Sequence, residues 1–355
     1  MAVDLERLFL SMMDRMDWRV GGNVLRYSGL RPSHGWLGTI AKFRNAARKL
    51  AIGQKEGRRL YSVYRENLAC GDRYIRFYDV SEQQRKALIQ WALNLNIEAS
   101  VFSRAFPYML TEAQLGSIEP NKSLVSAVEE YSTGYAVFFA ANRVHHVRER
   151  IDTDKMTATV SKVFEQYDEV IGVKVTRKQA MDVVWLPKSH GPIEVRIDVQ
   201  ACPIVETSMS AHEDIRQIVN ASFGVNILKT PVNLFPSIKK LYDSPKEGTV
   251  VEMAFLTGTA SIKHETMRKT GKCLREEKFH EAGVDALEGD IRAYLISITW
   301  PHQFGSDYHS FPEANLRGTS RLLDELAPKL HDLSIRRAWG LADFDLARNK
   351  VLAHL

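Results

Sequence analysis

Cysteine, glycine and proline are scarce in this 355-residue chain, and long apolar runs are missing. The three cysteines (Cys70, Cys202 and Cys273) lie far apart. Their odd number favours reduced thiols inside a cell over a disulfide framework. With 21 glycines and 12 prolines, the chain is not a low-complexity sequence. It contains no run of about 18 apolar residues, so we expect no transmembrane helix and no membrane partner.

Sequence motifs of common enzymes are also missing. The chain has no G-x-x-x-x-G-K-[ST] loop, no G-x-G-x-x-G after a strand and no G-x-S-x-G turn. Without H-E-x-x-H or CxxC spacing it has no signature of a zinc site, and we predict no cofactor. The first residues mix acids with apolar positions and lack the basic start of a secretory signal. We therefore expect a cytoplasmic location and, since housekeeping motifs are missing, an accessory or defence role.

What is present is the composition of a globular protein, with 45 % apolar and 26 % charged residues. Helical periodicity dominates the first 150 residues, including a helix predicted from about Lys122 to Arg150. Another helix is predicted to begin after Ser81, where Gln84 completes a capping box. Strand-like runs follow Asp152, and the pattern over 181–199 predicts a β-hairpin.

We therefore predict an α+β protein in which a mostly helical N-terminal region precedes a mixed α/β, sheet-containing C-terminal half. Three domains are predicted on this basis. They are a mainly helical basic domain (1–150), a small α/β domain with the β-hairpin at 181–199 (151–245), and an α+β C-terminal domain (246–355).

Positive charge is concentrated near the N-terminus. Residues 1–80 hold 15 Lys and Arg against 8 Asp and Glu, whereas the whole chain has a net charge of only +5. Arginine forks bind phosphate oxygens, and the aromatic residues Phe43, Tyr61, Tyr64 and Tyr74 between them could stack on unpaired bases. The simpler alternative is a charged helix face that is exposed to solvent while its aromatic side chains are buried in the core. The predicted nucleic-acid-binding residues are Lys42, Arg44, Arg48, Lys49, Lys55, Arg58, Arg59, Arg65, Arg73 and Arg76.

A second pattern lies in the middle of the chain. A helix, a strand, a strand with Asp182, a strand with Glu194-x-Arg196 and a further helix follow one another over roughly residues 155–225. This order resembles the core of the PD-(D/E)xK nuclease superfamily. The resemblance implies that Asp182 and Glu194 would hold Mg²⁺ or Mn²⁺ and that the third position would help to activate water. That position is Arg196 here, and arginine is a poor base because it stays protonated; Lys174 on the preceding strand is another candidate.

The same hairpin has a plainer interpretation. Apolar residues alternate with Glu194, Arg196 and Asp198, which is typical of an antiparallel sheet with one solvated, charged face. We favour this interpretation. The leading functional hypothesis is thus a non-catalytic nucleic-acid-binding or assembly subunit that binds the phosphate backbone through its basic N-terminal region. The alternatives are a metal-dependent nuclease and a protein–protein scaffold, and a protein partner or a homo-oligomer is compatible with each.

Overall fold

The computed structural model describes residues 3–47, 54–202, 205–258, 260–268, 271–287 and 291–355. The described helices are α1 (Leu5–Arg15), α2 (Trp18–Tyr27), α3 (Gly35–Ala47), α4 (Gln54–Cys70), α5 (Glu82–Leu93), α6 (Val101–Ala105), α7 (Glu112–Leu115), α8 (Ala158–Phe164), α9 (Val205–Phe223), α10 (Phe235–Asp243), α11 (Lys278–Asp285) and α12 (Leu341–Leu352). The described strands are β1 (Arg73–Tyr78), β2 (Leu124–Glu130), β3 (Gly134–Arg150), β4 (Ile171–Pro187), β5 (Ile193–Asp198), β6 (Thr249–Leu256), β7 (Ile262–Thr266), β8 (Arg292–Thr299), β9 (His302–Phe304), β10 (Tyr308–Ser310), β11 (Glu313–Arg317) and β12 (Leu333–Arg336).

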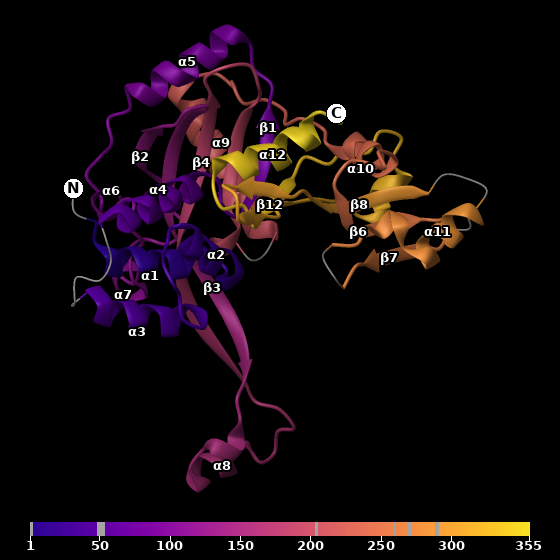
Figure 1. The fold of residues 1–355 in the computed structure, drawn as a ribbon. Coiled ribbons are helices and arrows are strands. Elements are labelled where there is room, and N and C mark those ends of the chain that lie inside the picture. Colours follow the sequence, from indigo (N-terminus) through magenta and orange to yellow (C-terminus); the bar gives the residue numbers. More distant parts are fainter. Residues whose placement is uncertain (1–2, 48–53, 203–204, 259, 269–270, 288–290) are drawn as a thin grey trace.

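An antiparallel sheet in the order β2-β3-β4-β5-β1-β12-β11-β8-β6-β7 organises the molecule (Figure 1). The α+β class is confirmed, with helices α1–α4 preceding the first strand. The sheet crosses both predicted domain boundaries, at residues 150 and 245. Strands β3 and β4 pair across the first boundary, and β1 lies between β5 and β12. All three predicted segments therefore contribute strands to one sheet.

The predicted helix over 122–150 is wrong, because β2 and β3 occupy this stretch. Residues Ala136 to Arg143 of β3 are buried almost without interruption. A strand covered on both faces has no need to alternate apolar and polar residues. That pattern cannot be distinguished from a buried helix by periodicity alone.

Two layers of helices cover the sheet. Helices α1–α4, α10 and α12 pack against one face, which we call the bundle face; Leu8, Phe77, Trp185 and Phe344 belong to its core. Helices α5 and α9 cover the other face over β3, β4, β5 and β1, and we call this the α9 face. In β3, β4, β5 and β1, side chains of successive residues therefore enter different cores.

The predicted hairpin at 181–199 is confirmed by the pairing of β4 with β5. Val183 lies opposite Arg196, and Trp185 lies opposite Glu194. Directly opposite residues of an antiparallel pair point to the same face. This register determines which charged residues of the hairpin lie on the same face and can meet.

Strands β3 and β4 continue far beyond the rest of the sheet (Figure 1). We call residues 144–178 the arm. Its shaft consists of residues 144–150 and 171–178, which pair from Val144 with Arg177 to Arg150 with Ile171, and its tip consists of residues 151–170 with α8. Among the helices that the structure describes, none combines the length and apolar character needed to cross a bilayer.

Candidate nucleic-acid interface

Four of the ten predicted phosphate-binding residues are exposed and form no ion pair with a described residue: Lys42, Lys55, Arg58 and Arg59. Three others have acidic partners, because Arg44 pairs with Glu6, Arg65 with Glu129 and Arg76 with Asp332. Residues Arg48 and Lys49 lie outside the described residues.

Arg73 does not reach the surface. It is fully buried at the start of β1 and donates to the backbone carbonyls of Leu68 and Met181. Burial lowers the pKa of Arg73 to about 10, although Asp198 opposes this shift. A fully buried arginine whose two Nη groups donate to the protein backbone cannot bind external phosphate in this fold.

The exposed cations gather around the turn between α2 and α3. The Lys42 Nζ donates to the carbonyl oxygen of Arg31 at 2.6 Å, which places the middle of α3 beside this turn. The Arg59 guanidinium lies 4.0 Å from the centroid of the Tyr27 ring, which brings α4 to the end of α2. The basic cluster thus defined consists of Arg26, Arg31, Lys42, Lys55, Arg58 and Arg59, all exposed.

Positive charge in the basic cluster is almost unopposed. Its six cations form no ion pair within the described part of the chain, and Glu56 is the acidic residue that α4 places among them, beside Gly29. Arg26 and Arg31 were missed by sequence analysis because they precede the dense basic stretch. The turn between α2 and α3 brings these two arginines close to the basic residues of α3 and α4. Counting charge over a longer stretch of sequence that includes this turn could have found them.

Two of the interleaved aromatic residues turn inward. Phe43 is buried and stacks on Phe9 with ring centroids 5.0 Å apart. Tyr64 is also buried, and its hydroxyl donates to the carbonyl oxygen of Pro107 at 2.8 Å. Neither ring is available for base stacking. Tyr61 and Tyr74 are partly exposed. The exposed groups that define the basic cluster are cations, whose chemistry is that of phosphate contacts.

The structure does not bring Asp182 and Glu194 together. Asp182 lies opposite Phe139 of the α9-face core, whereas Glu194 lies opposite Trp185 of the bundle-face core. The two carboxylates therefore point to opposite faces of the sheet. The prediction that they meet across the hairpin is wrong, so this structure forms no site that both carboxylates share. The sequence spacing was right for a hairpin, but the register differs by one residue from the one required.

Each of the three residues is instead held by a buried partner. Asp182 is fully buried, pairs with Arg143 and accepts the backbone N–H of Asp198 at 2.8 Å. Glu194 accepts from Arg196 Nε and from Arg348 Nη1 of α12, both at 2.8 Å. Burial opposes the charge on Glu194, but Arg196 and Arg348 outweigh it and hold the pKa of Glu194 below its ordinary value.

The prediction of a solvated charged face for β5 is also wrong. Glu194, Arg196 and Asp198 are all buried, since α1, α4 and α12 cover the bundle face. Asp198 pairs with Arg15 of α1. The charges of this strand are thus neutralised inside the protein and are closed to substrate.

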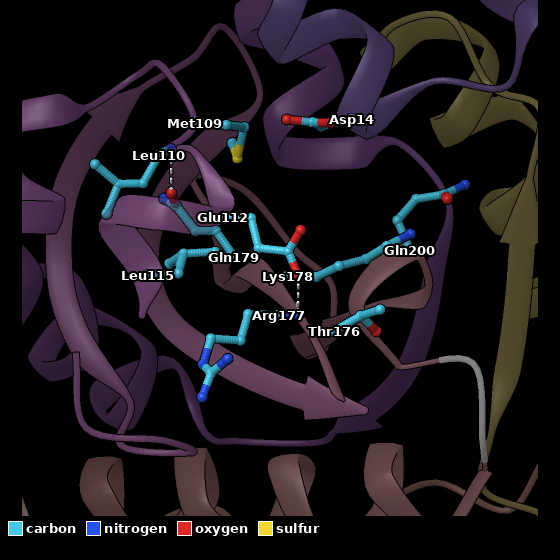
Figure 2. Close-up of a pocket in the computed structure, with 10 residues that line it drawn as sticks. All are labelled: Asp14, Met109, Leu110, Glu112, Leu115, Thr176, Arg177, Lys178, Gln179 and Gln200. Carbon is cyan, nitrogen blue, oxygen red and sulfur yellow. Dashed lines mark hydrogen bonds between the residues drawn. The ribbon is translucent and has the colours of Figure 1, made fainter. Parts of the chain in front are cut away.

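A pocket of about 270 Å³ lies where the arm leaves the body (Figure 2). Asp14 of α1, Glu112 of α7 and Lys178 of β4 supply its charged groups, while the Arg177 side chain points away from them in Figure 2. Burial raises the pKa of Asp14, although Lys178 and Arg15 oppose this shift. With two carboxylates against one ammonium group, the pocket is a poor site for phosphate.

A longer groove crosses the uncovered half of the sheet and contains balanced charge. Two adjoining hollows of about 450 and 720 Å³ share Glu313 and Arg336 as lining residues. Glu313 pairs with Arg337 at 2.9 Å, and Glu252 pairs with Arg317 at 3.1 Å. Positive charge in the basic cluster is therefore less compensated by acidic residues than in any of these three hollows.

Within the described ranges, no group of three or more His, Cys, Asp or Glu side chains is placed to hold a metal ion. Comparison with models of known families, with curated proteins and with solved structures finds no match for this chain. The assignment of function therefore depends on the chemistry of its surface.

Proposed function

We propose that the protein is a non-catalytic nucleic-acid-binding or assembly subunit that holds the phosphate backbone through the basic cluster. The observation that carries this proposal is the gathering of six exposed cations from α2, α3, α4 and the turn after α2, none of which forms an ion pair with a described residue. Four of the six are arginines, whose planar forks match phosphate oxygens.

The chemistry of the surface supports binding that is insensitive to base sequence. With Phe43 and Tyr64 buried, the cations supply contacts to phosphate, and such contacts position a nucleic acid without reading it. Affinity of this kind depends steeply on salt, because each contact releases a condensed counterion. For six contacts on duplex DNA, the slope of log K against log salt is about −5.

The test is fluorescence anisotropy of labelled duplex DNA, single-stranded DNA and RNA over a salt series. Lys55→Ala, Arg58→Ala and Arg59→Ala are combined in one variant. Loss of three contacts should weaken binding to all sequences alike and reduce the magnitude of the salt slope by about 3.

A matched variant, Lys86→Ala with Lys122→Ala and Lys263→Ala, removes the same charge from exposed positions outside the basic cluster. It should bind as the natural chain does. Equal weakening in both variants, or no binding at about 50 mM salt, where phosphate contacts are strong, would contradict the proposal. Shortening of the strands on a gel with Mg²⁺ or Mn²⁺ would contradict its non-catalytic part.

A further inference from the structure

The arm projects into solvent from the body of the protein (Figure 1). Strand β2 pairs with β3 only as far as Ala140, and β5 pairs with β4 only over 183–185, so no described strand pairs with either edge of the shaft. At its base, the N–H of Arg177 donates to Glu112 of α7. A two-stranded ribbon alone is marginally stable in water. Its open edges also present unpaired backbone groups. The arm therefore has the features of a segment that is completed by a partner.

Apolar side chains are unusually exposed along the arm. In the shaft, Ile171 is 54 % and Val173 60 % exposed, and in the tip Val163 is 64 % exposed. The pairing places Ile171, Val173 and Val175 on one side of the ribbon, opposite Arg150, Arg148 and His146. One face of the shaft is thus an apolar stripe beside a basic one. A surface of this kind marks an interaction site.

Charge is divided between the two parts of the arm. The shaft holds five Lys and Arg against one acid, a net charge of +4, whereas the tip holds five acids against two lysines, a net charge of −3. Within the arm, Arg150 approaches Glu169 at 3.6 Å. Arg148 and Lys174, by contrast, form no ion pair with any residue that the structure describes.

We propose that the arm is a self-association element, and that two copies of this chain dimerise by packing their arms antiparallel. The acidic tip of each copy then lies on the basic shaft of the other, and the apolar stripes are covered. Such an arrangement has twofold symmetry, in which the same surface of both copies meets itself. Each strand of the shaft contributes about eight residues at roughly 3.3 Å each, so the arms overlap over about 26 Å.

The division of charge favours a second copy over a nucleic acid. A basic ribbon alone could enter a DNA groove. Here, however, the tip would lead the ribbon toward phosphates with its five acids. In an antiparallel pair of arms, the same acids meet cations along the full overlap.

The test is the mass of the full-length protein in solution, measured by analytical ultracentrifugation over a concentration series. The natural chain should dimerise, and added salt should weaken the dimer. Arg148→Glu with Arg150→Glu changes the charge of the shaft face that carries the apolar stripe from +3 (Arg148, Arg150 and Arg177) to −1, so that both parts of the contact are acidic, whereas Glu165→Lys with Asp168→Lys changes the tip from −3 to +1. Each double variant alone should be monomeric at concentrations at which the natural chain is dimeric.

Mixing the two double variants decides the matter. An acidic arm and a basic arm attract at both contacts, so the mixture should regain the dimer mass. Circular dichroism of each variant shows whether it is folded, and Lys86→Glu with Lys122→Glu, away from the arm, should dimerise as the natural chain does. A natural chain that stays monomeric, or a mixture that forms no heterodimer, would overturn the proposal.

Discussion

Arg196 is fully buried between two aromatic rings. Its guanidinium carbon lies 4.4 Å from the Trp185 ring centroid and 4.6 Å from that of Phe344. Its Nη1 donates to the carbonyl oxygen of Ala69 at 2.9 Å, and Nε donates to Glu194. Glu194 also binds Arg348, so one carboxylate neutralises guanidinium groups from β5 and α12. These residues join the centre of the sheet to the last helix described here.

Glu194→Gln tests this arrangement. It leaves the buried guanidinium of Arg196 without a carboxylate, while Arg348 keeps Asp345 at 3.0 Å. At neutral pH it should lower the free energy of unfolding by roughly 3 kcal/mol in denaturant titrations. The pKa of Glu194 lies below its ordinary value of 4.5 in the folded protein. The stabilisation is therefore complete above that value and is lost as the pH falls through the lower, folded pKa.

The difference in stability between the natural chain and Glu194→Gln should thus be constant above about pH 5 and shrink below about pH 4.5. The exposed Glu276→Gln serves as the control and should change stability little at any pH. If the difference persists undiminished to pH 3, the carboxylate does not act by its charge.

At the scale of elements, helix α5 shows what a local signal can predict. The Ser81 hydroxyl accepts the N–H of Gln84 at 3.2 Å, and the Gln84 side chain accepts the N–H of Ser81 at 2.8 Å. The predicted capping box is confirmed, since all its atoms lie within four residues. The face of α5 that carries Leu88 and Ala92 packs into the core of the α9 face.

Ser81→Ala removes this cap and should destabilise the protein by about 1 kcal/mol in denaturant titrations. Ser81→Asp, which keeps an acceptor at the same position, should retain most of the stability. Ser62→Ala is the control, because Ser62 is exposed within α4 and alanine there raises helix propensity, so this change should cause no loss of stability. A loss at position 62 equal to that at position 81 would show that capping is not the cause.

Elsewhere, prediction ended where long-range packing began. The hairpin of β4 and β5 could be predicted from the alternation of apolar and charged residues and from the turn between the strands. The helices that cover its charged face could not be predicted in this way. Arg15, which neutralises Asp198, lies 183 residues away in the sequence. In the candidate site, Lys55, Arg58 and Arg59 could be predicted as exposed because they share one helix. Burial of Arg73 depends on β1 lying at the centre of the sheet, which no local pattern shows.

At the scale of the whole molecule, the central position of β1 joins distant parts of the chain. Its Arg73 lies opposite Asp198 on one side and Ile335 on the other. The six tryptophans are spread along the chain, from Trp18 to Trp339. Their fluorescence therefore reports on all three predicted segments.

Unfolding by denaturant should consequently give one transition, with tryptophan fluorescence and far-ultraviolet circular dichroism changing together. The reason is that β1 contributes side chains to both cores, and β12 joins it to the strands of the C-terminal segment. Limited proteolysis should likewise yield no stable fragment ending near residue 150 or 245. Two separated transitions, or such a fragment, would show that the predicted domains are independent units.

The placing of β1 between β5 and β12 has a consequence for biosynthesis. β1 ends at Tyr78 and β12 begins at Leu333. At about 5–20 residues per second, the ribosome needs roughly 13–50 s to make the residues between them. Until β12 emerges, the edge of β1 that β12 will cover stays open, and open strand edges template aggregation. A chain that ends before Leu333 therefore lacks the strand that joins β1 to β11 and cannot close its sheet.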